Sequence, residues 1–290
     1  MNKNTLIQKL NAYERLMRLD KPIGVLLLLW PTLWGLLLAG DGKLNWQVTC
    51  IFITGVVLMR SAGCVMNDIA DRDYDGHVER TKQRPIVSGE VSVKEAFLLA
   101  GGLSLVAFGF VCFLNNLTIL LSIAALFLAA TYPLTKRFLA IPQAYLGIAF
   151  GFGIPMAFAA IQNHIPLIAW WLLAANILWA IAYDTEYAMV DRDDDIKIGI
   201  QSSALFFGKY DVFAIMVCYI AMLGIFVYVG KLMAFGPIYF AGLVVTSGLV
   251  FWQYQMINTR VKANCFKAFL TNNWIGFTLL LSMVAAYLMA

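Results

Sequence analysis

Residues Asn67 to Asp75 read NDIADRDYD, and residues Asp191 to Asp195 read DRDDD. We call these the first and the second acidic run; each closes a long apolar segment of the chain. Carboxylates near a membrane are costly unless a partner compensates their charge, and acids crowded into one run cannot compensate one another. The two runs therefore predict a binding site for divalent cations at the ends of two membrane helices.

The composition of the chain is that of an integral membrane protein. Of its 290 residues 61% are hydrophobic and 13% are charged, whereas charged residues make up about 25% of a soluble domain. Apolar segments of roughly 17 to 25 residues can cross a bilayer as helices. The sequence predicts an all-α, multi-pass protein with about nine such segments, at residues 22–40, 46–66, 96–114, 117–133, 142–161, 165–183, 212–230, 233–253 and 272–289.

The basic residues predict the orientation of these helices, because lysine and arginine collect on the cytoplasmic side of a membrane. Most of the 21 lysines and arginines lie in the N-terminal arm or in the loops after the second, fourth, sixth and eighth predicted helices. We expect a cytoplasmic N-terminus and both acidic runs facing the cytoplasm. Residues 1–21 are expected to form an amphipathic arm on that surface.

The similarity of the two acidic runs indicates two similar helical bundles around a central cavity, a common plan among membrane proteins. No linker divides the chain, so residues 1–290 are treated as one domain. The segment from Gly147 to Gly153 is glycine-rich but lies inside an apolar helix. It predicts close helix packing and not a nucleotide-binding loop, and nothing in the sequence indicates a nucleic-acid partner.

Helical periodicity places the spaced acids of each run on one face, at about 3.6 residues per turn. On the helix that carries the first acidic run, this face holds Asn67, Asp68, Asp71 and Asp75. On the helix that carries the second acidic run, it holds Asp184, Asp191 and Asp195. Mg²⁺ prefers oxygen ligands and often binds one or two carboxylates together with substrate phosphates, so two separated carboxylate stripes predict a Mg²⁺–diphosphate site.

Basic side chains beside the acids would bind the diphosphate oxygens. The alternative is that each of these side chains only contributes to the cytoplasmic excess of positive charge. The expected diphosphate ligands are Arg72, Arg80, Lys82 and Arg84 beside the first run, and Arg192 and Lys197 beside the second.

The pattern Asn67-Asp68-x-x-Asp71-x-x-x-Asp75, followed by Asp191-x-x-x-Asp195, resembles the UbiA superfamily of intramembrane prenyltransferases. Three further segments resemble its branch of bacterial 4-hydroxybenzoate polyprenyltransferases, which act in ubiquinone biosynthesis. They are residues 16–24 (LMRLDKPIG), 60–68 (RSAGCVMND) and 183–191 (YDTEYAMVD). The likeness extends over about residues 13 to 270, and it implies a protein of the bacterial inner membrane.

This resemblance implies transfer of a polyprenyl group from its diphosphate to the ring carbon ortho to the hydroxyl of 4-hydroxybenzoate, with release of diphosphate. The expected Mg²⁺ ligands are Asp71, Asp75, Asp191 and Asp195, with Asn67 and Asp68 assisting. Metal-bound carboxylates would neutralise the leaving diphosphate as the allylic bond breaks. Asp184 is one candidate for the acceptor of the ring proton, and released diphosphate is another.

The carboxylate of such an acceptor needs a cation in the membrane-embedded part of the cavity. Arg60 is the basic residue that lies within a predicted helix, on the same face as Asn67 and about two turns deeper. An arginine facing lipid would be costly, so Arg60 is expected to point inward, either toward the acceptor or into a structural ion pair. Arg137 is the competing carboxylate ligand, and its alternative role is that of a positive anchor.

Two other functions stay open. A prenyltransferase of the same fold could use another acceptor, such as a naphthoate or a haem precursor. A cation transporter would also place acids at a membrane edge. The acids of this chain lie at one side only and none lies inside a predicted helix away from the two runs, which argues against an ion path.

Overall fold

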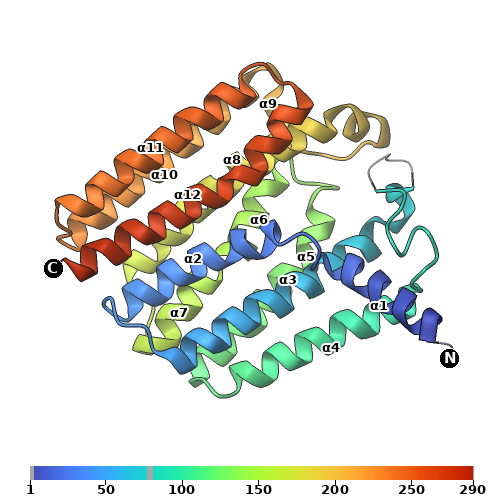
Figure 1. Ribbon diagram of the computed structural model, residues 1–290, viewed down its shortest axis with the longest axis horizontal. Helices are drawn as coiled ribbons and strands as arrows, with labels where there is room; N and C mark the ends of the chain where they lie inside the picture. The colour runs from blue at the N-terminus through green and yellow to red at the C-terminus, as the bar shows by residue number, and fades with distance from the viewer. Residues whose placement is uncertain (1–2, 77–80, 290) are drawn as a thin grey trace.

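The computed structural model describes residues 3–76 and 81–289, and these residues are entirely helical or irregular (Figure 1). The all-α prediction is therefore confirmed over the described part of the chain. The helices are α1 (Lys3–Met17), α2 (Ile23–Ala39), α3 (Trp46–Asp75), α4 (Val93–Val111), α5 (Asn116–Thr135), α6 (Pro142–Gly151), α7 (Gly153–Gln162), α8 (Leu167–Ile198), α9 (Ser203–Phe207), the 3-10 helix η1 (Gly208–Tyr210), α10 (Asp211–Leu232), α11 (Pro237–Ile257) and α12 (Lys262–Leu288).

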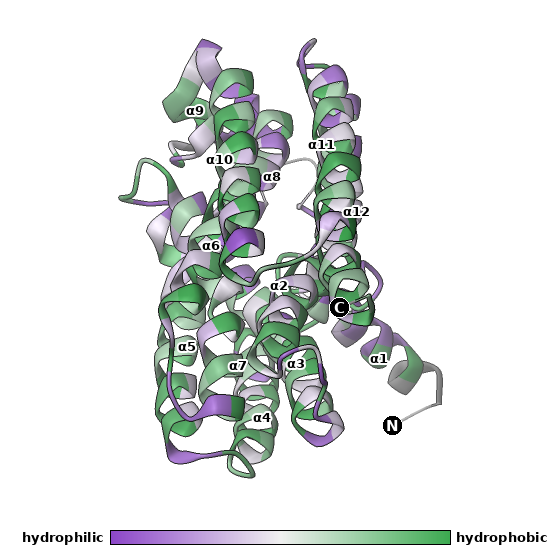
Figure 2. Cartoon of the chain, turned by 90° about the vertical axis from the view of Figure 1, so that its left-hand side faces the viewer, coloured by the Kyte–Doolittle hydropathy of each residue, from purple (hydrophilic) through white to green (hydrophobic). Residues whose placement is uncertain are grey.

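The predicted membrane segments agree with the structure to within their ends. Among the described residues eight helical segments are long and apolar enough to span a membrane, and α2 is a shorter apolar helix of 17 residues. Hydrophobic residues run along α4, α5 and α10, whereas hydrophilic residues gather in α1 and at the helix ends (Figure 2). The two termini lie at opposite ends of the molecule (Figure 1), as an odd number of crossings requires.

Two differences from the predicted segments matter for function. Helices α3 and α8 extend beyond the predicted segments 46–66 and 165–183 and continue through the acidic runs, to Asp75 and Ile198. The predicted segment 142–161 is divided into α6 and α7 at Phe152. Pro155 explains the break, because proline has no N–H to donate to the carbonyl of Gly151 one turn earlier.

Glycines allow α6 and α7 to pack closely against their neighbours, as the glycine-rich segment predicted. A Cβ atom on Gly147 would lie 2.7 Å from Ile177 Cα of α8, and one on Gly153 would lie 2.6 Å from Thr32 Oγ1 of α2. Both distances are shorter than real Cβ contacts, so side chains at these positions would separate the helices. The close contacts hold α2 and α8 on either side of the α6–α7 pair.

One turn of α12 accepts three indole N–H groups and joins α2 to α8. Trp179 donates to Asn272 Oδ1 over 2.9 Å, Trp30 donates to Asn273 Oδ1 over 2.8 Å, and Trp34 donates to the carbonyl of Gly276 over 3.2 Å. Buried polar groups are costly unless they are hydrogen-bonded. These bonds therefore fix the three helices that form one wall of the interior.

Helix α1 is amphipathic, as the sequence indicated. Its buried residues Ala12 and Leu16 pack against Val65 and Ile69 of α3, while Ile7 and Leu10 are exposed. Lys9 pairs with Glu95 at the start of α4 over 2.9 Å. The arm is thus attached to the same end of the molecule at which α3 carries the first acidic run.

Candidate active site

A cavity of about 1370 Å³ lies at the ends of α3 and α8 and extends inward between α3, α4 and α5. The seven residues that the periodicity placed on two helix faces all line this cavity. They are Asn67, Asp68, Asp71 and Asp75 of α3, and Asp184, Asp191 and Asp195 of α8. Two segments more than a hundred residues apart thus contribute to one polar site.

Arg84 lies between two acids of the first run. Its Nη1 is 2.6 Å from Asp75 Oδ2 and 3.0 Å from Asp68 Oδ1, and Asp68 is 1% exposed. Burial works against the charge of this guanidinium, but the two carboxylates outweigh it and raise the pKa of Arg84 above its usual range. Arg84 therefore stays cationic at the mouth of the cavity.

Two other cations reach the first run from elsewhere in the chain. Arg18, in the connection between α1 and α2, donates to both oxygens of Asp68 over 2.8 and 3.1 Å. Lys136, just after α5, forms an ion pair with Asp71 Oδ2. The second oxygen of Asp71, Oδ1, is buried and accepts no hydrogen bond from the protein. A buried carboxylate oxygen without a donor is suited to a cation.

Asp184 lies about two turns before Asp191 on α8, and Gln143 of α6 lines the cavity together with it. The Gln143 side chain interacts with the Asp184 carboxylate, and its Oε1 accepts the backbone N–H of Ser203 over 3.1 Å. The start of α9 is thereby tied to the polar floor of the cavity. The geometry places a fixed carboxylate next to the space that a substrate would occupy.

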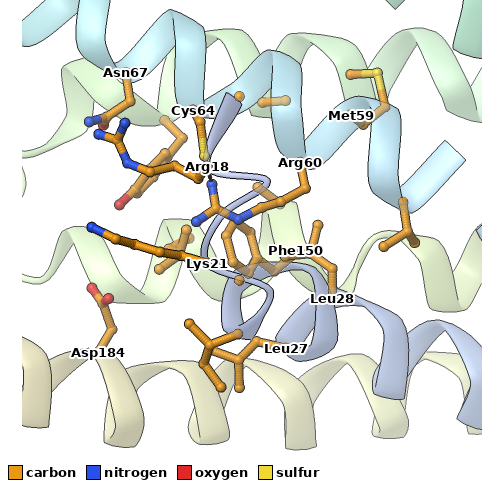
Figure 3. A pocket seen from close by; sticks show the side chains of 18 of the residues that line it. Arg18, Lys21, Leu27, Leu28, Met59, Arg60, Cys64, Asn67, Phe150 and Asp184 are labelled. Atoms are coloured by element: carbon orange, nitrogen blue, oxygen red, sulfur yellow. Dashed lines mark hydrogen bonds between the residues drawn. The ribbon is translucent and has the colours of Figure 1, made fainter. Parts of the chain in front are cut away.

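Arg60 points into the deeper part of the cavity, beside Cys64 and near the ring of Phe150 (Figure 3). Its Cζ is 5.8 Å from the centre of that ring, a cation–π distance. Arg60 Nε is buried without a hydrogen-bond partner. In the same view Lys21 extends between Arg18 and Asp184. The inner part of the site therefore combines positive charge with an aromatic wall.

Apolar side chains of α4 and α5 line the inner part of the cavity. Its lining there includes Leu105 and Phe108 of α4 and Ile123 and Leu126 of α5. All four side chains are exposed and not packed in the core, Leu105 by 73%. A long hydrocarbon chain could lie in this passage and continue into the bilayer.

Arg137, expected beside the acceptor, lies outside the cavity. Its Nη2 donates to the carbonyl of Ala70 over 2.8 Å, and its Cζ lies 5.6 Å from the ring of Tyr74. Consecutive residues of a helical turn point in different directions, so the inward position belongs to its neighbour Lys136. The sequence indicated that the loop after α5 contributes a cation to the site, but not whether this cation is Lys136 or Arg137.

Of the six basic residues expected to bind diphosphate, the structure brings Arg84 into the cavity and directs four others elsewhere. Arg72 donates to the carbonyl of Ile69 over 3.0 Å, and Lys82 is exposed. Arg192 is paired with Asp211, and Lys197 is exposed and lies 3.1 Å from Asp194. Arg80 lies outside the described residues.

Sequence reasoning missed several residues that line the cavity: Arg18, Lys21, Tyr132, Lys136, Gln143 and Asp194. For Arg18 and Lys21 a signal was present, because both belong to the segment 16–24 that carried the family resemblance. For Lys136 the signal was its position next to Arg137. Gln143 and Tyr132 carry no charge, and nothing in the sequence pattern distinguished them.

The donors suit a Mg²⁺ ion that substrate oxygens help to hold. Among residues 3–76 and 81–289, no three His, Cys, Asp or Glu side chains converge closely enough to hold a metal by themselves. The acids are instead divided between α3 and α8, and one Asp71 oxygen is without a donor. Mg²⁺ sites commonly combine one or two carboxylates with phosphate oxygens, so the residues present fit the metal.

Comparisons with known proteins place the chain among prenyltransferases. The model of the UbiA prenyltransferase family matches residues 28–283. The chain is 62% identical to the 4-hydroxybenzoate octaprenyltransferase of Methylobacillus flagellatus, over 99% of this chain and 97% of that one. It is 60% identical to the enzyme of the same name from Nitrosospira multiformis, over 98% of each chain.

Solved structures share the fold. The apo structure of a UbiA homolog from Aeropyrum pernix K1 is 26% identical to this chain, with a TM-score of 0.78, and covers 91% of this chain and 96% of its own. A UbiA homolog from Archaeoglobus fulgidus, bound to GPP and Mg²⁺, has a TM-score of 0.68 at 21% identity, over 96% of this chain and 100% of its own. The second likeness, at this lower identity, concerns the fold alone.

Proposed function

The chain belongs to the UbiA prenyltransferase family, and on this premise we propose that it transfers a polyprenyl group from polyprenyl diphosphate to carbon 3 of 4-hydroxybenzoate, with release of diphosphate. This is the ring position ortho to the hydroxyl, and the reaction is a step of ubiquinone biosynthesis. The names of its relatives support the acceptor. The observation that carries the proposal is the single cavity that joins two carboxylate stripes, an inner arginine and an apolar passage.

In this proposal the carboxylates of both acidic runs hold Mg²⁺ together with the diphosphate. The metal would neutralise the negative charge that develops on the leaving diphosphate. The ligands are Asp71, Asp75, Asp191 and Asp195, with Asn67 donating to Asp71 Oδ2 over 3.0 Å. Asp68 has a different task, because its two oxygens are already engaged by Arg18 and Arg84. It keeps these two cations at the mouth of the cavity.

The diphosphate oxygens would be bound by the cations that line the cavity, Arg84, Lys136, Arg18 and Lys21. Hydrogen bonds from charged donors to phosphate oxygens are short and strong. Arg84 and Lys136 already point at the acidic runs, so they lie next to the place where a metal-bound diphosphate would be. Arg72, Lys82, Arg192 and Lys197 point elsewhere and are not part of this proposal.

The acceptor would lie deeper, with its carboxylate on Arg60 and its ring next to Asp184. Arg60 has a buried Nε without a partner, which a carboxylate oxygen would satisfy. Once the allylic bond breaks, the prenyl fragment has cationic character and the electron-rich phenol ring attacks it. Asp184, which lines the cavity, would accept the proton that leaves the ring carbon.

The apolar passage between α4 and α5 would take the polyprenyl chain, with membrane lipid as its continuation. A tail that extends into the bilayer need not be enclosed by protein. The N-terminal arm, the basic loops and the acidic runs support a cytoplasmic site in a bacterial inner membrane. Residues 1–290 would act as one catalytic domain.

The decisive experiment measures prenyl transfer to radiolabelled 4-hydroxybenzoate in membranes that contain the protein. Polyprenyl diphosphate is supplied with Mg²⁺ or with EDTA. Product is expected only with Mg²⁺ and is expected to be lost in Asp191→Asn, whereas Asp193→Asn is the matched control because Asp193 points away from the cavity. If inserted protein makes no product, a naphthoate acceptor is tested next, and metal uptake into vesicles without prenyl diphosphate tests the transporter.

A further inference from the structure

The second acidic run has an outer face that the proposed chemistry does not use. Asp191 and Asp195 line the cavity, but Arg192 and Asp193 do not. Asp193 is exposed and pairs with Lys262 at the start of α12, at 2.8 Å. Such an exposed pair contributes little to stability. Arg192, in contrast, belongs to a buried cluster of charged side chains.

Asp211 is the centre of this cluster. It is the first residue of α10, and its side chain is fully buried. The guanidinium of Arg192 pairs with Asp211 Oδ2 and also donates to the carbonyl of Ala204 in α9 over 3.0 Å. The end of α8 is thus attached to α9 and to the start of α10.

A second arginine approaches Asp211 from the connection between α11 and α12. Arg260 Nη2 donates to Asp211 Oδ1 over 2.8 Å, and its Nε donates to the same oxygen over 3.0 Å. Nη2 also donates to the carbonyl of Lys209 over 2.8 Å. Arg260 has a φ of +55°, a left-handed conformation that is uncommon for residues other than glycine. Arg260 makes its contacts with Asp211 and Lys209 from this unfavourable backbone conformation.

The cluster has consequences for the orientation of α8. A buried carboxylate is tolerated because two guanidinium groups surround it, and removal of one partner leaves buried charge uncompensated. Arg192 directly follows Asp191, so the two side chains leave the helix about 100° apart around its axis. A fixed Arg192 therefore sets the rotation of this turn about the helix axis.

We propose that Asp211 is a positioning residue for the second acidic run. It acts through Arg192 and keeps the last turns of α8 in the rotation that directs Asp191 and Asp195 into the cavity. Arg260 completes the charge balance of Asp211 and joins the α11–α12 connection to the same anchor. The inference rests on the proposed function in one respect, namely that Asp191 and Asp195 hold the metal.

The test is a titration of the purified full-length protein with Mn²⁺ in detergent. The electron paramagnetic resonance signal of free Mn²⁺ measures how much of the added metal stays unbound. Polyprenyl diphosphate is present, the acceptor is omitted, and the same titration without protein is subtracted. Asp211→Asn is expected to weaken Mn²⁺ binding by about 10-fold or more, as loss of a residue that orients metal ligands does. The KM for 4-hydroxybenzoate is expected to stay unchanged.

Two further variants separate positioning from loss of stability. Tyr239→Phe removes a buried hydrogen bond to the carbonyl of Phe226, 2.8 Å long, between two helices away from the cavity. It is expected to lower thermal stability but not Mn²⁺ affinity. Arg192→Lys keeps the charge but offers a single ammonium group in place of the fork that reaches both Asp211 and Ala204. It is expected to weaken Mn²⁺ binding less than Asp211→Asn, and it replaces that variant if Asp211→Asn does not fold.

The outcomes distinguish the two proposals. If the wild-type protein does not bind Mn²⁺ beyond the blank, the metal site fails, and the role of Asp211 fails with it. If wild type binds but Asp211→Asn and Arg192→Lys bind equally well, the positioning role alone is overturned. The same holds if Tyr239→Phe weakens Mn²⁺ binding as much as Asp211→Asn does.

Discussion

The guanidinium group of Arg60 lies directly against Gly24, so that a Cβ atom on Gly24 would lie only 2.7 Å from Arg60 Cζ. Gly24 is the second residue of α2, directly after the connection that carries Arg18 and Lys21. Arg60 lies on α3, about two turns deeper than Asn67. The absence of a side chain at position 24 therefore decides where the inner cation of the cavity can lie.

The variant Gly24→Ala is expected to move Arg60 without disturbing the fold, because the atoms that the new methyl group meets are the end of a flexible side chain. Hydrogen bonds to charged groups are worth about 1.5 to 3 kcal/mol, so the KM for 4-hydroxybenzoate should rise by about 10-fold or more. The KM for polyprenyl diphosphate should change little. Steady-state kinetics with each substrate varied in turn measures the difference.

The control for this variant is Gly102→Ala on α4, where an added Cβ meets no atom within 4 Å. It should leave both KM values unchanged. An equal rise of both KM values in Gly24→Ala would contradict the assignment of Arg60 to the acceptor.

The pair of Arg84 with Asp68 and Asp75 makes a second prediction. Arg84→Gln removes the cation that compensates two buried carboxylates, and the loss of one partner of a buried ion pair costs about 3 to 5 kcal/mol. The variant should therefore melt at a lower temperature in detergent and should bind polyprenyl diphosphate more weakly. Thermal unfolding followed by tryptophan fluorescence and the KM for the diphosphate test both effects.

Arg72→Gln is the matched comparison for Arg84→Gln. Arg72 belongs to the first acidic run but lies outside the cavity and is partly solvent-exposed. Unchanged stability and KM are expected. A strong effect of Arg72→Gln on the KM for the diphosphate would show that sequence proximity to the acids, and not the cavity, identifies the diphosphate ligands.

Lys136 and Arg137 are neighbours that the fold directs to different sides. Lys136→Met removes the ion pair with Asp71 and a cation of the cavity, so kcat/KM for the diphosphate should fall by about 10-fold or more. Arg137→Met should keep most of the activity, because Arg137 contacts the carbonyl of Ala70 and the ring of Tyr74. The reverse ranking of the two variants, measured side by side, would reject the orientation of this loop.

The buried hydrogen bonds of Asn272 predict an effect on stability that is separate from catalysis. Asn272 accepts from Trp179 and from Tyr219, and its Nδ2 donates to Glu186 over 2.7 Å. Asn272→Leu leaves the indole N–H of Trp179 and Glu186 Oε2 without this partner, at about 1 to 3 kcal/mol for each unsatisfied group, while Tyr219 still donates to Glu186 Oε1 over 2.9 Å. A clearly lower melting temperature is expected, with substrate KM values of the remaining folded protein close to wild type.

The neighbouring variant Asn273→Leu disturbs fewer groups. Within the described part of the chain, the Asn273 side chain hydrogen-bonds only to the indole N–H of Trp30. Its melting temperature should fall by less. If the two variants lose the same stability, the connected bonds of Asn272 do not act as a unit.

Periodicity and composition were sufficient to predict the membrane segments, the amphipathic arm and the two carboxylate stripes. These features follow from properties of single helices: apolar length sets which segments can cross a bilayer, and the 3.6-residue repeat sets which side chains share a face. Asp71 and Asp75, or Asp191 and Asp195, belong to one face wherever their helix is placed. The packing of that helix was not needed to predict it.

Which basic side chains face the cavity was decided only by the packing of the helices. Lys136 and not Arg137 meets Asp71, and Arg192 turns to Asp211 although it lies inside an acidic run. Arg18 reaches Asp68 from a connection 50 positions earlier in the chain. Loops have no repeat that assigns a face to each residue, and a long cationic side chain pairs with whichever carboxylate the folded chain brings within reach. The charges of the site could therefore be counted from the sequence, but their partners depended on the tertiary structure.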